Sequence, residues 1–173
     1  MQSLKNHMEH PIIIISAMSE NRVIGSGEGM PWSVPAEYEQ YLRFVTGKPV
    51  VMGRRTYEIF GPDLPDSTTA IVVTRSEEVA GAEVAGAEVA GSLDDAITAA
   101  KRFDDDIFIA GGGSIYKQAV PVADKMYLST IKGEFSGDTY FPEFNLGNWE
   151  VAEERDEPEF IFRKYHRHAN DAS

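Results

Sequence analysis

Hydrophobic residues in this chain gather in short unbroken runs that alternate with stretches of helical spacing. The unbroken runs cover residues 12–15, 49–53, 70–74 and 106–110 and are rich in isoleucine and valine. A β-branched run without polar alternation is typical of a strand buried on both faces, as in a parallel sheet. The pattern therefore predicts four buried strands.

The stretches between these runs carry helix signals. Pro35 opens a helix predicted over residues 35–44, because proline is favoured in the first helical turn. Shorter helices are expected over residues 54–60 and 114–120, and Ser92 is a capping signal for one that includes residues 96–103. Alternation of strands and helices predicts an α/β fold with a parallel sheet.

The C-terminal part of the chain has a different pattern. Residues 125–131, 149–154 and 160–166 are typical of strands with no helix between them, which predicts an antiparallel edge. A length of 173 residues suits one hydrophobic core. We therefore expect a single domain over residues 11–168, with tails at residues 1–10 and 169–173.

Composition excludes several classes of protein. The chain has no cysteine, which excludes a disulfide scaffold or a thiolate metal site. The four histidines lie in the terminal stretches and are not spaced as metal ligands, so no metal is expected. No apolar run approaches the roughly 20 residues of a membrane span. We expect a cytoplasmic protein without a membrane partner.

The chain is strongly acidic. It has 28 Asp and Glu against 16 Lys and Arg, a formal net charge of −12. This field repels nucleic acid, so an anionic ligand would need a local cluster of cations. The excess is either that of an ordinary acidic cytosolic protein or a means of solvation at high salt.

A five-residue unit, EVAGA, recurs nearly three times within residues 78–91. Five residues is not the period of a solenoid repeat. We interpret the segment as a repeat expansion in a surface connection or an edge strand, without a chemical role.

Two predicted turns between strand and helix carry signals for anion binding. Gly111, Gly112 and Gly113 precede the helix that opens at Ser114, so they form either a phosphate site or a tight structural turn. The second turn contains Gly53, followed by Arg54, Arg55 and Thr56, and Arg75 follows the next strand. Ligands bind at such strand ends in open α/β sheets. These cations favour a phosphate-rich dinucleotide such as NADPH, and the alternative is a solvated basic patch.

Glu37 is the candidate for acid–base chemistry. It lies in the first turn of the helix over residues 35–44, one turn before Tyr41 on the same face. If that face is apolar, desolvation raises the pKa of the carboxyl and suits it to bind an amidine-like heterocycle. The alternative is a glutamate that complements the helix dipole. The glycine-rich residues 25–31 before this helix form a candidate lid.

Five stretches together resemble the dihydrofolate reductase family, in the order in which the family carries them. They cover residues 21–25, 30–37, 48–58, 109–116 and 137–142. The resemblance implies a mostly parallel eight-stranded sheet flanked by helices, with an antiparallel C-terminal edge. It also implies reduction of 7,8-dihydrofolate to tetrahydrofolate with NADPH, competition by antifolates and a monomeric state.

The resemblance also implies roles for individual residues. Glu37 would bind the pterin and assist protonation of N5, with Trp32 and Ser129 in support, and Met30 would belong to a lid steadied by Asp138. The residues implied for the substrate are Ile15, Glu37, Tyr38, Tyr41, Phe44, Ile59, Leu64, Ala110 and Ser129. The residues implied for NADPH are Ala17, Ile24, Gly25, Gly53, Arg54, Arg55, Thr56, Thr74, Arg75, Gly111, Gly112, Gly113, Ser114, Ile115, Tyr116 and Thr139. A cis peptide is implied between Gly111 and Gly112.

The chain departs from the family pattern in two places. The pocket acid is Glu37 where bacterial members commonly carry aspartate, and both acids occur in the family. Where the family usually has an arginine that clamps the substrate's glutamyl tail, this chain has Ser67 or Thr68, and a nearby position that is often lysine is Leu42. We therefore expect weak recognition of the tail.

Two rival interpretations are a pyrimidine reductase of riboflavin synthesis and a nucleotide-binding protein without catalysis. The pyrimidine reductase shares the fold and cofactor but does not need the pterin carboxylate, so Glu37 favours the folate enzyme. A protein that only binds nucleotides needs neither a pocket acid nor a glycine-rich lid.

Overall fold

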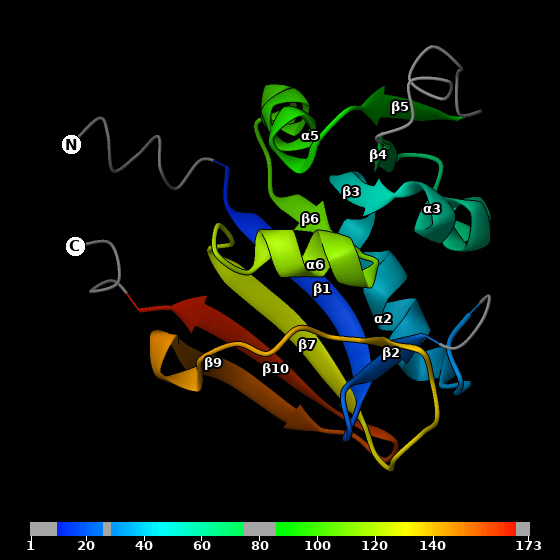
Figure 1. Ribbon diagram of the computed structural model, residues 1–173, viewed down its shortest axis with the longest axis vertical. Helices are drawn as coiled ribbons and strands as arrows, with labels where there is room; N and C mark the ends of the chain where they lie inside the picture. The colour runs from blue at the N-terminus through cyan, green and yellow to red at the C-terminus, as the bar shows by residue number, and fades with distance from the viewer. Residues whose placement is uncertain (1–9, 26–28, 75–85, 169–173) are drawn as a thin grey trace.

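The computed structural model describes residues 10–25, 29–74 and 86–168. Its centre is an eight-stranded sheet with the strand order β5-β4-β3-β6-β1-β7-β10-β9 (Figure 1). The strands are β1 (Ile12–Ser19), β3 (Pro49–Gly53), β4 (Thr69–Val73), β5 (Ala87–Ala90), β6 (Ile107–Ile109), β7 (Lys125–Ile131), β9 (Trp149–Asp156) and β10 (Phe160–Arg167). The α-helices are α2 (Pro35–Val45), α3 (Arg54–Phe60), α5 (Leu93–Ala100) and α6 (Gly113–Ala119). Short 3-10 helices cover η1 (Gly61–Asp63), η2 (Lys101–Phe103) and η3 (Leu146–Asn148).

The predicted mostly parallel eight-stranded sheet with an antiparallel C-terminal edge is confirmed. From β5 to β7 every neighbouring pair of strands is parallel, and β10 is antiparallel to both β7 and β9. Residues 125–131 were predicted in the antiparallel edge, and β7 does pair antiparallel with β10. Its other neighbour, β1, is parallel to it, because α6 carries the chain back before β7 begins, so β7 joins the parallel part of the sheet to the antiparallel edge.

Two apolar clusters lie on the two faces of the sheet. One joins α5 and α6 to inward residues such as Ile14, Ile71 and Leu128. The other joins α2 to the opposite face through Val45, Val50 and Phe162. In Figure 1, α6 lies in front of the central strands. Successive residues of β1 point to opposite faces of the sheet, so Ile14 belongs to the first cluster and Ile13 and Ile15 to the second.

The predicted helix starts are confirmed. Pro35 is in the first turn of α2, and the Ser92 hydroxyl oxygen accepts a hydrogen bond of 3.0 Å from the Asp95 amide at the start of α5. The C-terminal part of the EVAGA repeat contains β5, an edge strand as one of our interpretations expected. Residues 78–85 of the repeat lie outside the described part of the chain.

A second, two-stranded sheet pairs β2 (Val23–Gly25) with β8 (Thr139–Tyr140). It brings the loop after β1 beside the loop after β7. Within the described residues, no helix is long and apolar enough to cross a membrane.

Candidate active site

Two adjoining hollows open beside the second half of β1 and the carboxyl ends of β3 and β6. Their empty volumes are about 630 Å³ and about 1470 Å³. They share a wall made by Ile24, Thr56, Phe60 and Gly112. This is the edge at which parallel α/β sheets bind ligands, because the connecting loops and helix starts converge there.

The first hollow is mainly apolar and contains one carboxylate, that of Glu37, among the described residues that line it. Of the residues predicted to bind substrate, it brings together Ile15, Glu37, Tyr38, Tyr41 and Ala110. Met30, predicted for the lid, and Ala17 and Tyr116, predicted for the cofactor, also line it.

Glu37 is held in this hollow by the geometry of α2. Pro35 starts the helix, so Glu37 lies in its first turn, on the face that packs against the sheet. The residue is 6% exposed. Burial raises the pKa of Glu37 to about 7, and a hydrogen bond with the Ser129 hydroxyl partly opposes that rise. The carboxyl is thus poised near half-protonation at neutral pH.

Tyrosines surround this carboxyl. Tyr38 donates a hydrogen bond of 2.6 Å to Asp63, and Tyr116 donates one of 2.7 Å to the Ile15 carbonyl inside the protein. Burial raises the pKa of Tyr41 and Tyr116 well above the ordinary value, and the negative charge of Glu37 adds to the effect. These hydroxyls therefore stay protonated at neutral pH and keep their role as hydrogen-bond donors.

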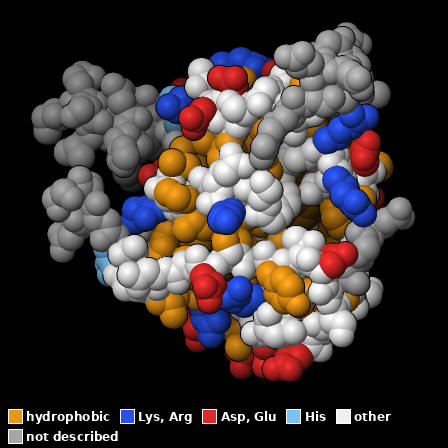
Figure 2. All heavy atoms as spheres, viewed as in Figure 1, with side chains coloured by type: hydrophobic (Ala, Val, Ile, Leu, Met, Phe, Trp, Pro, Cys, Tyr) orange, Lys and Arg blue, Asp and Glu red, His pale blue; other side chains and the backbone are white. Residues whose placement is uncertain are grey.

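The second hollow is wider and more polar. It is lined by the starts of α3 and α6, by Thr74 at the end of β4 and by Thr139 of β8. Of the residues predicted for the cofactor, it brings together Ile24, Gly25, Gly53, Arg54, Arg55, Thr56, Thr74, Gly112, Gly113, Ser114, Ile115 and Thr139. Figure 2 shows basic side chains at the right-hand edge of the face in view, where Figure 1 draws α3.

The turn before α6 requires glycine. Gly111 has a φ of +101°, and a Cβ atom there would lie 2.9 Å from the Tyr116 ring. Its carbonyl accepts a hydrogen bond of 2.8 Å from the Gly53 amide, which joins the turns after β6 and β3. The Gly111–Gly112 peptide is cis, so that prediction is confirmed. Gly111 itself lines neither hollow.

The loops of β2 and β8 meet at the mouth of the site. The Asp138 amide donates a hydrogen bond of 3.0 Å to the Gly25 carbonyl. A Cβ atom on Gly137 would lie 2.4 Å from that carbonyl oxygen, so the approach depends on glycine. This contact places Asp138 beside the loop that leads to Met30. Residues 26–28 of that loop lie outside the described residues.

Other predicted residues lie apart from the lining of the first hollow. Ile59, predicted for the substrate, lines the second hollow. Phe44 stacks on Phe162 beneath α2, with ring centroids 5.6 Å apart, and Trp32 meets the Phe135 ring edge-on. Leu64 packs against the apolar cluster between α2 and the sheet, and Ser129 is buried. Arg75 lies outside the described part of the chain.

Several residues of the site were missing from the predicted substrate and cofactor residues. Ser16 and Phe60 line the first hollow, and Gln40 is buried under α2 beside Ser129. The second hollow is also lined by Gly29, Val73, Gly91, Ser92, Leu93 and Gln118. Gln40 follows Glu37 by three residues, so helical spacing alone places the two on one face. Among the described residues, no group of three or more His, Cys, Asp and Glu could hold a metal ion.

Comparison with known proteins matches this architecture. The family model of dihydrofolate reductase matches residues 11–167. The dihydrofolate reductase of Haemophilus influenzae is 41% identical over 138 residues, covering 80% of this chain and 82% of that protein. Dihydrofolate reductase HdrB of Haloferax volcanii is 34% identical over 164 residues, covering 90% of this chain and 82% of that protein.

A solved structure is similar as well. It is the dihydrofolate reductase of Enterococcus faecalis in complex with NADP(H) and the ligand RAB-propyl. The TM-score is 0.81 at 27% sequence identity, covering 91% of this chain and 96% of that one. The family match over nearly the whole chain and the shared fold lead to one conclusion: the chain belongs to the dihydrofolate reductase family.

Proposed function

We propose that the chain reduces 7,8-dihydrofolate to 5,6,7,8-tetrahydrofolate with NADPH, and that Glu37 is the carboxyl that binds the pterin and assists protonation of N5. The observation that carries the role of Glu37 is its burial in the first hollow, with a pKa raised to about 7. A fully exposed glutamate would be ionised at neutral pH and could not keep a proton available.

Glu37 would act in both of its protonation states. As a carboxylate it accepts hydrogen bonds from the amino group and N3–H of a pterin, an arrangement that suits a planar heterocycle. As a carboxylic acid it holds a proton inside the hollow, from which N5 of the substrate can be supplied. The apolar lining excludes water and strengthens both interactions.

Tyr116, Ala110 and Ile15 line the same hollow. The Tyr116 hydroxyl donates to the Ile15 carbonyl, so this carbonyl is the acceptor of a hydrogen bond from a residue that also lines the hollow. We propose that the Ile15 and Ala110 carbonyls accept from the pterin amino edge, while Tyr38 and Tyr41 flank the ring system.

The second hollow fits a phosphorylated dinucleotide. A Cβ atom at Gly113 would lie 3.0 Å from the Thr139 methyl carbon, a tight contact, and one at Gly112 would lie in van der Waals contact with Thr56 Oγ1 at 3.4 Å. Glycine at these two positions leaves the backbone accessible to a ligand. Hydroxyls of Thr56, Thr74 and Ser114 and the guanidinium groups of Arg54 and Arg55 lie around it. NADPH supplies the hydride when bound. These residues would hold its phosphates by hydrogen bonds and charge.

The test is to mix the protein with NADPH and 7,8-dihydrofolate and to measure the loss of absorbance of the reduced nicotinamide over time. We expect oxidation of NADPH that depends on dihydrofolate and is inhibited by an antifolate. A pyrimidine intermediate of riboflavin synthesis serves as the alternative substrate. Oxidation with the pyrimidine but not with dihydrofolate would refute the proposal, as would binding of NADPH without any turnover.

A further inference from the structure

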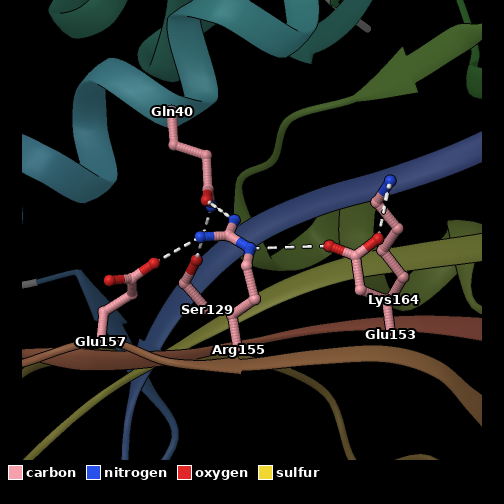
Figure 3. A network of polar contacts seen from close by, with 6 residues as sticks. All are labelled: Gln40, Ser129, Glu153, Arg155, Glu157 and Lys164. Atoms are coloured by element: carbon pink, nitrogen blue, oxygen red, sulfur yellow. Dashed lines mark hydrogen bonds and ion pairs between the residues drawn. The ribbon is translucent and has the colours of Figure 1, made fainter.

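A polar chain links the buried site to the outer edge of the sheet. Ser129, beneath Glu37, lies 3.4 Å from the Gln40 amide nitrogen, and the Gln40 amide oxygen accepts a hydrogen bond from Arg155 of β9 (Figure 3). We propose that Gln40 and Arg155 are positioning residues, which orient the Ser129 hydroxyl so that its proton points to Glu37. This inference rests on the proposed role of Glu37.

Strand register explains how an edge residue reaches this far. Ser129 of β7 is paired with Phe162 of β10, and Phe162 is paired with Arg155 of β9. Residues in one row across a sheet point to the same face, so all three side chains face α2. The Arg155 guanidinium lies over the Phe162 ring at 4.9 Å and extends across β10 to the buried amide of Gln40.

The guanidinium of Arg155 is fixed by partners at each of its nitrogens. Nη2 donates to Gln40, Nη1 to Glu157, and Nε faces Glu153 at 3.5 Å (Figure 3). Glu153 also faces Lys164 at 3.5 Å. An isolated exposed ion pair contributes little, but a network around one planar group restrains that group.

This arrangement determines the direction of each hydrogen bond. A guanidinium only donates, so the Gln40 atom that faces it must be the amide oxygen, and the amide nitrogen must face Ser129. The Ser129 oxygen then accepts from Gln40. Its single proton is left for the Glu37 carboxyl, with which it is hydrogen-bonded. Without Arg155 the amide can turn over and take that proton for itself.

The other ionisable groups around Glu37 do not compete for this role. Tyr38 and Tyr41 of α2 and Tyr116 of α6 interact with its charge, and Asp63 of η1 acts on the two tyrosines of α2. The pKa of each tyrosine is raised far above neutrality. In the neutral range the Ser129 hydroxyl is therefore the group whose direction Gln40 and Arg155 control.

The primary variant is Gln40→Met, which breaks the chain without any change in charge. Without a donor to its oxygen, the Ser129 hydroxyl is no longer held toward Glu37 and can turn to another acceptor. A neutral hydrogen bond contributes about 0.5–1.5 kcal/mol, so loss of the Ser129 hydrogen bond should raise the apparent pKa of Glu37 by roughly half to one unit. The rise is read from the pH profile of kcat/KM for dihydrofolate. It is also read from the 13C-carboxyl NMR titration of Glu37, which needs no turnover.

Arg155→Met should raise the same pKa by a similar amount, and the double variant should add little to the larger single effect, because both act through one chain. Arg155→Lys, which keeps the charge and a donor, should restore part of the original value. Arg163→Met is the matched control. Arg163 pairs with Glu154 on the neighbouring strand and is in register with Leu128, one row away from Ser129. It should leave the pKa unchanged.

Three outcomes would overturn the proposal. Gln40→Met could leave the pKa of Glu37 unchanged, the effects of the two single variants could add fully, or Arg163→Met could produce the same rise as Arg155→Met.

NADPH affinity should stay constant in all variants, because neither Gln40 nor Arg155 lines the second hollow, and a loss of NADPH affinity would indicate misfolding. In that case Arg155→Met, which leaves the side chains of α2 unchanged, carries the test in place of Gln40→Met and must raise the pKa. If the wild-type protein fails to turn over dihydrofolate, the proposed function fails, while the NMR titration still decides the role of the chain.

Discussion

The two hollows differ in the sign and the burial of the charged side chains that line them. Among the described residues that line them, the first has one carboxylate and no arginine or lysine, and the second has two arginines and no carboxylate. Glu37 is buried, whereas Arg54 and Arg55 are exposed. A buried charge is costly, so desolvation acts on the protonation state of Glu37. An exposed guanidinium stays charged and hydrated, so it serves for attraction and for charge-assisted hydrogen bonds.

This difference teaches what each hollow can do. The first can gain or lose a proton near neutral pH, because burial raises the pKa of Glu37 and the hydrogen bond with the Ser129 hydroxyl lowers it. The second can attract and hold an anion although the protein carries a net charge of −12. The two arginines that line the second hollow are a local source of positive charge. Local placement rather than net charge decides which ligand is attracted.

The largest effect is expected from removing the ionisable group of the first hollow. Glu37→Gln keeps the shape of the side chain but cannot exchange a proton, so kcat/KM for dihydrofolate at pH 7 should fall by about 10²–10⁴-fold. NADPH binding should be retained, because Glu37 does not line the second hollow. The measurement is the pH profile of kcat/KM.

Glu39→Gln is the matched control for that variant. Glu39 lies two residues further along α2 and is exposed, so the same chemical change should have little effect on turnover. Near-normal activity of Glu37→Gln at pH 7 would contradict the role assigned to the buried carboxyl.

The free energy of unfolding of Glu37→Gln, relative to that of the unsubstituted protein, should increase with pH. The pKa of Glu37 is near 4.5 when unfolded and about 7 when folded, so between these values the folded state binds the extra proton. Stability attributable to Glu37 therefore falls with rising pH across this window, by about 3 kcal/mol in all, and is constant above it. Glu37→Gln lacks this loss. Denaturant unfolding of both proteins at about pH 5 and pH 8 measures the difference. A difference that does not grow with pH would show that the carboxyl is not desolvated.

The sequence predicted the fold well because its strongest signals are local. Isoleucine and valine runs, Pro35 and Ser92 each determine a strand or a helix start without reference to the rest of the chain. The direction of β7 was less accessible, because it depends on which strands become neighbours. Resemblance to a family supplied the strand number and most of the lining of both hollows.

The polar chain behind Glu37 was not predicted, and the reason is register. Gln40 could have been placed on the Glu37 face by helical spacing, but nothing local pairs Ser129 with Phe162 or Phe162 with Arg155. These residues come together only when three strands are aligned. Along β9 itself, Arg155 is one charge among many exposed ones.

The next effect concerns cofactor binding by Arg55, which lines the second hollow, and by Arg75, which lies outside the described residues. We predict that Arg55 and Arg75 bind the 2′-phosphate that distinguishes NADPH from NADH. Replacing both by alanine should weaken NADPH binding by at least roughly tenfold, because charged hydrogen bonds contribute about 1.5–3 kcal/mol, and should change NADH binding much less. Dissociation constants of both cofactors provide the measurement. Arg102→Ala, which removes an exposed arginine that pairs with Glu88 and lines neither hollow, is the control. An equal loss of affinity for NADPH and NADH would show that these arginines do not bind the 2′-phosphate.

The smallest effect is expected at the substrate's glutamyl tail. The Thr68 hydroxyl donates a hydrogen bond of 2.6 Å to the Val45 carbonyl at the end of α2, so it is engaged within the protein, and Ser67 offers no charge. The tail carboxylates also face the negative field of the protein, which salt screens. We predict that KM for dihydropteroate, which lacks the tail, exceeds KM for dihydrofolate by less than about tenfold, where an arginine clamp would contribute roughly ten- to hundredfold.

The salt dependence of the two KM values provides a second test of how the tail is recognised. Added salt should lower KM for dihydrofolate more than KM for dihydropteroate, because screening relieves repulsion only where the tail carries charge. Arg43, exposed on α2, is the cation to test, and Arg43→Ala should leave the ratio of the two KM values unchanged. A penalty near a hundredfold for removing the tail, abolished by Arg43→Ala, would instead mean that α2 supplies the missing clamp. The first hollow would then hold its substrate with an exposed cation as well as with a buried acid, and the contrast between the two hollows would narrow.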